Sequence, residues 1–349
     1  MPKDITALYR AHGLTLRTKT HNEQCGPCPW CGGRDRFTVF AEQGKDGLGR
    51  FWCRQCGKSG DAIQFLRDME GLSFKDARLA LGLAEAPLRR CPAPPATKPS
   101  PPEFIPPEIA IPGPVWQERS LKIVTWACDQ LRQAPEAQAW LGWERGIFTE
   151  TARAARLGWI PQDVYRPRET FGLPPECGKN GKPKRVWIPK GLCIPVFHQD
   201  GRLLRVKFRV AEPGDSRPKY IPLPQAEKCT APLVLESRAQ ALPWQVVESE
   251  LDALLLAQEA GHMVNVVGLG SASIRPDADT WAKLQAAPHV LLSLDFDEAG
   301  NKTACQWWAT HLPGRSKLWP VPEGKDPCDA WRAGWSLADW TREGLKDGN

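Results

Sequence analysis

Four cysteines near the start of the chain are spaced as two Cys-x2-Cys pairs. Cys28 and Cys31 form the first pair and Cys53 and Cys56 the second, with 21 residues between the pairs. Two such turns can present four thiolates tetrahedrally to Zn²⁺, and the metal then holds together a segment that is too small to bury a core of its own. The spacing therefore predicts one structural zinc ion held by these four cysteines.

Cys25 lies three residues before Cys28 and is a rival for the first ligand position. We favour Cys28, because the proline, tryptophan and glycines around Cys31 suit the tight turn of a zinc knuckle. Cations and aromatic residues surround the two pairs: Arg34, Arg36, Lys45, Arg50, Arg54 and Lys58, with Phe37, Phe51 and Trp52. They favour nucleic-acid binding through phosphate pairing and base stacking, although the aromatic residues could instead form the small core of a zinc ribbon.

The charge of the chain is unevenly distributed. Residues 115–230 carry 20 lysines and arginines against 12 acidic residues, whereas residues 231–349 carry 10 against 16. This distribution indicates a polyanionic partner and a cation site in one chain, unless the charges are only scattered over a solvated surface. There is no run of 18 apolar residues and no apolar signal core at the start of the chain. We therefore expect a cytoplasmic protein, without a membrane partner, whose cysteines are thiols or metal ligands.

Proline marks the clearest domain boundary. Residues 87–114 contain 11 prolines, a composition that excludes helices and sheet ladders and predicts an extended linker. The linker separates a zinc-ribbon domain at residues 1–86 from a basic α+β segment at residues 115–230, which includes a predicted hairpin near residues 192–210. From 231 to 349 strands and helices alternate, which predicts an α/β domain with a central parallel sheet. The whole chain is thus predicted to be a multidomain α+β protein.

Acidic residues follow the strands of this last segment. Glu248 ends one strand, with Asp252 one helical turn later; Asp295 and Asp297 end another, and Asp326 follows a third. Parallel strands bring such residues to one edge of the sheet. Because clustered carboxylates repel one another, the arrangement favours a divalent cation, and oxygen ligands suit Mg²⁺ or Mn²⁺.

The cysteine region, CPWCGGRDRF followed by FWCRQCGKSGDAIQFL, resembles the N-terminal zinc-binding domain of DNA primases of the bacterial and phage (DnaG) type. Its all-cysteine ligand set favours the phage or mobile-element type. The order of the acidic residues resembles the TOPRIM domain that primases share with topoisomerases and some nucleases. This resemblance implies that Glu248, Asp295 and Asp297 are catalytic and that they hold the cation together with Asp326, with Asp252 and Gly270 as further site positions.

Two residues depart from the TOPRIM pattern. Ser249 stands where primases usually have glycine, and Cys328 stands where a second aspartate often follows the proline of the DP motif. Asp329, one position further on, could take the place of that aspartate. A bulkier residue at position 249 would narrow the approach to the metal.

Residues 138–161 and 193–224 resemble the basic subdomain of primase catalytic cores, and this implies that Arg209, Lys219 and Tyr220 bind template or nucleotide. The implied reaction is synthesis of RNA primers from nucleoside triphosphates on single-stranded DNA. Glu248 could be a metal ligand or the general base. No GxxxxGK[ST] segment is present, so we expect any helicase partner to act in trans. The alternatives are a TOPRIM nuclease or topoisomerase and a non-catalytic DNA-binding protein of replication.

Overall fold

The structure is a computed structural model that describes residues 4–20, 22–43, 47–83, 104–178, 180–212, 214, 218–237, 242–271, 273–295 and 300–346. The chain divides into two compact units, residues 1–102 with 319–325 and residues 103–318 with 326–349. Most of the predicted linker, residues 87–103, lies outside the described residues, and residues 104–113 form neither helix nor strand.

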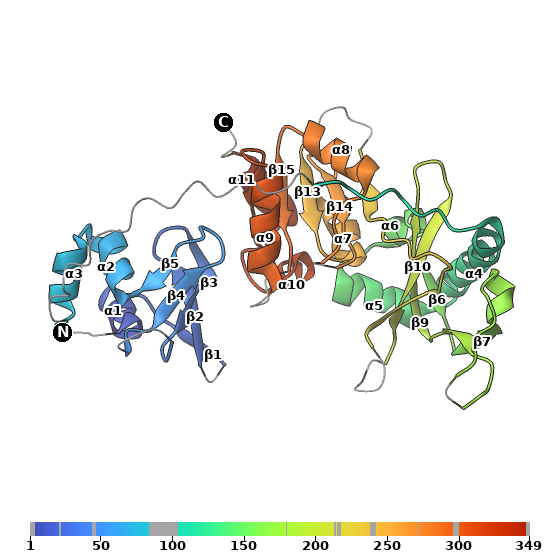
Figure 1. Ribbon diagram of the computed structural model, residues 1–349, viewed down its shortest axis with the longest axis horizontal. Coiled ribbons are helices and arrows are strands. Elements are labelled where there is room, and N and C mark those ends of the chain that lie inside the picture. Colours follow the sequence, from blue (N-terminus) through green and yellow to red (C-terminus); the bar gives the residue numbers. More distant parts are fainter. Residues whose placement is uncertain are drawn as a thin grey trace. The chain divides into compact units, whose positions relative to one another are not determined.

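A five-stranded antiparallel sheet forms the centre of the first unit (Figure 1). Its strands follow one another in chain order: β1 (Arg17–Thr20), β2 (Glu23–Cys28), β3 (Gly32–Phe40), β4 (Arg50–Cys53) and β5 (Ser59–Asp61). Three helices accompany it: α1 (Ile5–Ala11), α2 (Ala62–Glu70) and α3 (Phe74–Ala80). The helix-spaced apolar residues between positions 61 and 82 form two helices, because Gly71 ends α2 in the left-handed conformation.

Aromatic side chains fill the core of this unit. Tyr9, Phe37, Phe51 and Phe65 are buried, and the ring centroids of Tyr9 and Phe51 both lie 5.1 Å from that of Phe37. The burial of Phe37 and Phe51 rules out the base-stacking role suggested for these rings and supports the alternative, a core role. Trp52 is half-buried, and Lys45 lies outside the described residues.

The second unit begins with three helices and a four-stranded antiparallel sheet. The helices are α4 (Pro114–Arg132), α5 (Pro135–Arg145) and α6 (Thr149–Ala154). The sheet has the order β11-β10-β9-β6, with β6 (Gly158–Ile160), β9 (Gly191–Phe197), β10 (Leu203–Val210) and β11 (Tyr220–Pro222). Strands β9 and β10 are the predicted hairpin. A separate ribbon pairs β7 (Val164–Pro167) with β8 (Arg185–Ile188), and the short 3-10 helix η2 (Arg168–Phe171) follows β7.

Strand β10 has one apolar face and one cationic face. Val206 and Phe208 are buried in a core that also contains Val124 and Ala127 of α4. Alternate residues of a strand point to opposite faces, so Arg205, Lys207 and Arg209 lie on the other side. This face of β10 is where the basic part of the chain meets the acidic part, as described below.

The last part of the second unit is a five-stranded sheet with helices on both faces (Figure 1). Its order is β12-β14-β13-β15-β16, with β12 (Leu233–Leu235), β13 (Trp244–Val247), β14 (Asn265–Gly268), β15 (Val290–Ser293) and β16 (Ser316–Leu318). Strands β13 to β16 are parallel, which confirms the predicted parallel sheet, and β12 adds an antiparallel edge that was not predicted.

Alternation along β13 assigns the helices to the two faces of this sheet. Trp244 and Val246 share a core with residues of α8 (Ala278–Ala286) and α9 (Gly300–His311). Gln245 points the other way, toward α11 (Leu337–Lys346). Helices α7 (Glu250–Ala260) and α10 (Pro327–Arg332) complete the unit. None of the described helices combines the length and the apolar composition that a membrane span requires.

A buried hydrogen-bond chain ties α11 to the centre of the parallel sheet, and it generates a stability prediction. The amide of Gln245 donates to Ser293 Oγ at 2.9 Å and accepts from Thr341 Oγ1 at 3.1 Å. Thr341→Val keeps the shape but removes the donor, so the free energy of unfolding should fall by about 1–3 kcal/mol. Chemical denaturation measures this loss. Thr341→Ser, which keeps the hydroxyl, should be the more stable of the two variants, and the reverse order would contradict the role of the hydrogen bond.

Candidate active site and zinc site

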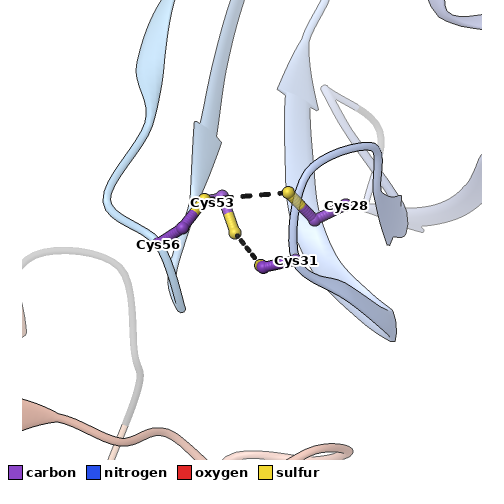
Figure 2. A group of neighbouring side chains, drawn as sticks. All are labelled: Cys28, Cys31, Cys53 and Cys56. Carbon is purple, nitrogen blue, oxygen red and sulfur yellow. Dashed lines mark hydrogen bonds between the residues drawn. The ribbon is translucent and has the colours of Figure 1, made fainter. Parts of the chain in front are cut away.

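The four predicted zinc ligands lie together in the first unit (Figure 2). Their sulfur atoms all lie within 4.8 Å of one another, with Cys28 Sγ 3.8 Å from Cys56 Sγ and Cys31 Sγ 3.5 Å from Cys53 Sγ. Hydrogen bonding to Cys28 raises the pKa of Cys31 and Cys53. Four sulfurs this close cannot all ionise without a cation among them, and an all-thiolate set of this size fits Zn²⁺.

Local backbone geometry explains why these cysteines meet. Cys28 ends β2 and Cys53 ends β4, and each Cys-x2-Cys turn is followed by a glycine with positive φ, +69° at Gly32 and +71° at Gly57. Residues other than glycine rarely adopt this conformation. Cys25 lies inside β2, where it pairs with neighbouring strands on both sides, and is not part of the sulfur group.

Glu248 and Asp295 leave the parallel sheet at the same edge. Strands β13 and β15 are hydrogen-bonded neighbours in which Val247 pairs with Ser293, so the residues that follow both strands emerge side by side. Gly270 follows β14 at this edge and donates its backbone N–H to the Glu248 carbonyl at 2.6 Å. Asp297 lies outside the described residues, so its place at the site remains a prediction from the sequence.

Asp252, Asp326 and Cys328 form a second group, made by the first turns of α7 and α10. One ligand atom from each lies within 4.8 Å of the others, and all three residues are buried. Asp326 is the N-cap of α10 and accepts from the backbone N–H of Asp329 at 2.8 Å. Cys328 is the third member of this group, and the charge of Asp329 also acts on Asp252 and on the Cys328 thiol. Burial raises the pKa of the Cys328 thiol to about 11.

Asp252 is held by two neighbours that explain its orientation. Ser249 caps α7 by accepting from the Asp252 N–H at 3.1 Å, and its hydroxyl donates to Asp252 Oδ2. Arg145, the last residue of α5, donates to Asp252 Oδ1 at 3.0 Å. Burial and the nearby carboxylate of Asp326 nevertheless raise the pKa of Asp252 to about 6. The serine that departs from the TOPRIM pattern is thus a helix cap that binds a site carboxylate.

A buried ionic cluster lies next to these groups and was not predicted. Glu250, with 1% of its surface exposed, accepts from Arg205 at 2.6 Å and lies 2.7 Å from Lys207 Nζ. Burial alone would raise the pKa of Glu250, but these two cations hold it below its usual value. Gly270 covers the cluster: a Cβ there would lie 2.9 Å from Glu250 Oε1, at a φ of +90°. The alternation of Arg205, Lys207 and Arg209 along one strand is the signal that could have revealed the two cations.

The predicted template-binding residues form a stack of cations and rings beside this cluster. Arg209 donates to the Tyr220 hydroxyl at 3.0 Å and lies over the ring of Trp140 at 5.0 Å. The exposed Lys219 places its ammonium 5.7 Å from the centre of the Tyr220 ring. Burial raises the pKa of Tyr220, and the charges of Arg209 and Arg145 oppose that shift. Arg145, which was not predicted, thus lies near both Tyr220 and Asp252.

The structure also contains a cavity of about 480 Å³ among α4, α5 and α6. Its lining combines aliphatic side chains with uncharged polar ones and three arginines, Arg132, Arg153 and Arg156, and includes no acidic residue. Three arginines without a carboxylate disfavour a divalent cation in this cavity.

The zinc site generates a prediction about metal content. Purified protein should contain one zinc ion per chain, and Cys28→Ser should lower the zinc content because a three-sulfur site binds the ion more weakly. Elemental analysis provides the measurement. Cys25→Ser is the matched control and should keep the full zinc content; loss of zinc from that variant would show that Cys25 is the first ligand.

The ionic cluster generates a prediction about stability. Glu250→Gln leaves Arg205 and Lys207 buried without a carboxylate, so the free energy of unfolding at neutral pH should fall by about 3–5 kcal/mol. Denaturant unfolding followed by circular dichroism measures the change. Glu118→Gln removes one partner of the exposed pair with Lys122 and should leave the midpoint unchanged. Equal effects of the two substitutions would show that the cluster contributes no more than a surface pair.

Two family models match the chain. Residues 23–63 match the zinc-binding domain of primase-helicase, and residues 245–331 match a Toprim-like domain. The first match contains the four cysteines, and the second contains Glu248, Asp252, Asp295, Asp326 and Cys328. The TOPRIM assignment of the parallel sheet is therefore confirmed.

Curated relatives and a solved structure agree with these matches. The DNA primase of Deinococcus radiodurans is 28% identical over 313 residues, which cover 82% of this chain and 50% of the relative. That of Pseudomonas putida is 26% identical over 321 residues, 81% of this chain and 45% of the relative. The chain thus spans about half the length of the curated relatives it matches. The structure of the DnaG catalytic core shares its fold, with a TM-score of 0.50 and 22% identity over 66% of this chain and 79% of that one. These findings relate the chain, in both its zinc-binding and its Toprim regions, to the DnaG-type DNA primases.

Proposed function

We propose that this chain is a DNA primase that synthesises short RNA primers on single-stranded DNA by metal-dependent nucleotidyl transfer. The observation that supports this most is the meeting of cations and carboxylates within the second unit. Arg145 donates a hydrogen bond to Asp252 at 3.0 Å and lies near Tyr220. The hydroxyl of Tyr220 in turn accepts a hydrogen bond from Arg209. A nucleotide whose phosphates contact these cations would lie beside the carboxylates of the parallel sheet.

The reaction requires a 3′-hydroxyl to attack the α-phosphorus of a second nucleoside triphosphate. A bond forms between the 3′-oxygen and phosphorus, the bond from phosphorus to the bridging oxygen breaks, and pyrophosphate leaves with its electron pair. When bound, a divalent cation neutralises the triphosphate and the charge that develops during transfer. Glu248, Asp295, Asp297 and Asp326 are the residues that we assign to hold it, with Glu248 alternatively accepting the hydroxyl proton. Mg²⁺ and Mn²⁺ are the ions that oxygen ligands suit.

The basic residues and the zinc ribbon would position the nucleic acid. Arg209, Lys219 and Tyr220 are assigned to template or triphosphate binding, since a guanidinium and an ammonium can each bind phosphate oxygens. On the ribbon, Arg34 and Arg50 are exposed, and we assign these to the single-stranded template. We further propose that a replicative helicase acts in trans. We also propose that the chain is of the phage or mobile-element type.

The competing functions make different demands on the chain. A topoisomerase needs a nucleophilic tyrosine, but Tyr9 is buried in the zinc-unit core and Tyr220 is bonded to Arg209, which leaves only Tyr165, exposed on β7. A TOPRIM nuclease would cut DNA with a divalent ion and no nucleotides. A non-catalytic protein would bind single-stranded DNA and neither cut it nor extend it.

Primer synthesis by aspartate variants tests the proposal. Labelled nucleoside triphosphates should enter short RNA on single-stranded DNA in the presence of Mg²⁺ or Mn²⁺. Asp295→Asn and Asp326→Asn should each lower the rate by about 10²–10³-fold, because several kcal/mol of charge stabilisation is lost at a metal site. Both should bind single-stranded DNA as well as the parent chain does, or slightly better, since a negative charge is removed.

The matched control is Asp339→Asn, which removes an exposed acidic side chain on α11 of the same domain and should leave the rate unchanged. DNA cleavage without nucleotides would favour the nuclease instead. DNA binding with neither cleavage nor primer synthesis would favour the non-catalytic alternative.

A further inference from the structure

The group formed by Asp252, Asp326 and Cys328 differs chemically from the rest of the candidate active site. Its three ligand atoms, two carboxylate oxygens and one sulfur, lie within 4.8 Å of one another. The relative exposures of the three residues are only 2%, 7% and 1%. Three potential metal ligands are therefore gathered in one buried place by the first turns of α7 and α10, inside the stretch that matches the Toprim-like family.

The guanidinium of Arg145 is the cation that is hydrogen-bonded to this group. Arg145 donates a hydrogen bond to Asp252, and Asp326 accepts one from the backbone N–H of Asp329. The Cys328 thiol donates to the backbone carbonyl of Glu144 at 3.2 Å, a weak bond that a stronger sulfur interaction could replace. Two buried carboxylates with one guanidinium leave room for a further positive charge.

The ligand atoms decide which cation fits. Mg²⁺ requires a near-octahedral set of oxygen ligands and gains little from sulfur, whereas Zn²⁺, Co²⁺ and Cd²⁺ accept thiolate together with carboxylate. Starting from the proposed primase function, we propose that Asp252, Asp326 and Cys328 form a second metal site, which is separate from the zinc ribbon and shares Asp326 with the assigned Mg²⁺ or Mn²⁺ site. This second site binds a thiophilic divalent cation through the Cys328 sulfur. When the ion binds, the metal–sulfur bond forms and the thiol proton passes to solvent.

The direct probe is Cd²⁺, because a thiolate bound to cadmium absorbs in the ultraviolet by charge transfer. Cd²⁺ is titrated into the full-length chain with its ribbon zinc in place, and elemental analysis confirms that one zinc per chain remains. The parent chain should bind one cadmium ion beyond the zinc and show the charge-transfer band. No bound cadmium beyond that exchanged into the ribbon would overturn the proposal.

Variants assign the band to one sulfur. Cys328→Ser and Cys328→Asp should both lose it while keeping the ribbon zinc, because neither retains a sulfur at the site. Cys177→Ser is the matched control: this exposed cysteine lies elsewhere in the second unit, and its removal should leave the band unchanged. Circular dichroism checks that each variant is folded, and Cys328→Asp serves if the serine variant is not. A band that persists in either folded Cys328 variant would overturn the proposal.

Primer synthesis separates this inference from the proposed function. Cys328→Asp restores an all-oxygen site, so the ratio of Mg²⁺-supported to Mn²⁺-supported synthesis should rise by about tenfold or more. If the parent chain shows the cadmium band but Cys328→Asp leaves this ratio unchanged, the link between this site and the reaction is overturned. If no variant makes primers with any ion, the primase proposal fails, while the absorption titration still decides whether the metal site exists.

Discussion

The carboxylate of Glu250 joins the two halves of the candidate active site. It lies buried between Arg205 and Lys207 of β10, while its own helix, α7, begins at the edge of the parallel sheet. Helix α7 also carries Asp252, and strand β10 also carries Arg209. The ionic cluster therefore sets the distance between the acidic residues of α7 and the basic residues of β10. Such a cluster contributes little net stability compared with an apolar contact, but it tolerates few alternative arrangements. Its role here is to fix geometry.

Glycine is required where this cluster reaches the sheet edge. Gly270 has a φ of +90° and lies so close that a Cβ would be 2.9 Å from Glu250 Oε1 and 3.1 Å from an Arg205 nitrogen. Its carbonyl accepts from Lys207 at 3.1 Å, and its N–H donates to the Glu248 carbonyl. One residue therefore connects the cationic strand to the backbone of the residue that we assign to catalysis.

Local spacing made part of this arrangement predictable. The Cys-x2-Cys pairs and the acidic residues after β13 and β15 depend on turns and on strand register, which the sequence pattern contains. The cationic partners of Glu250 depend on which strand packs against α7, and no local sequence pattern predicts that packing. Arg145 is an ordinary last-turn arginine in sequence; only the packing of α5 against α7 gives it a buried carboxylate as partner. The burial of Phe37 and Phe51 is a similar case, because rings in a small ribbon serve the core first.

Both departures from the TOPRIM pattern fall on the same part of the site. Arg145 engages Oδ1 of Asp252 and Ser249 engages Oδ2, so both oxygens of this carboxylate already accept hydrogen bonds. An ion entering here must share those oxygens or rely on Asp326 and Cys328. Because both oxygens of Asp252 already accept hydrogen bonds, a bound ion would depend more strongly on the Cys328 sulfur. The serine and the cysteine thus act in the same direction: the serine restrains an oxygen ligand, and the cysteine supplies a softer ligand.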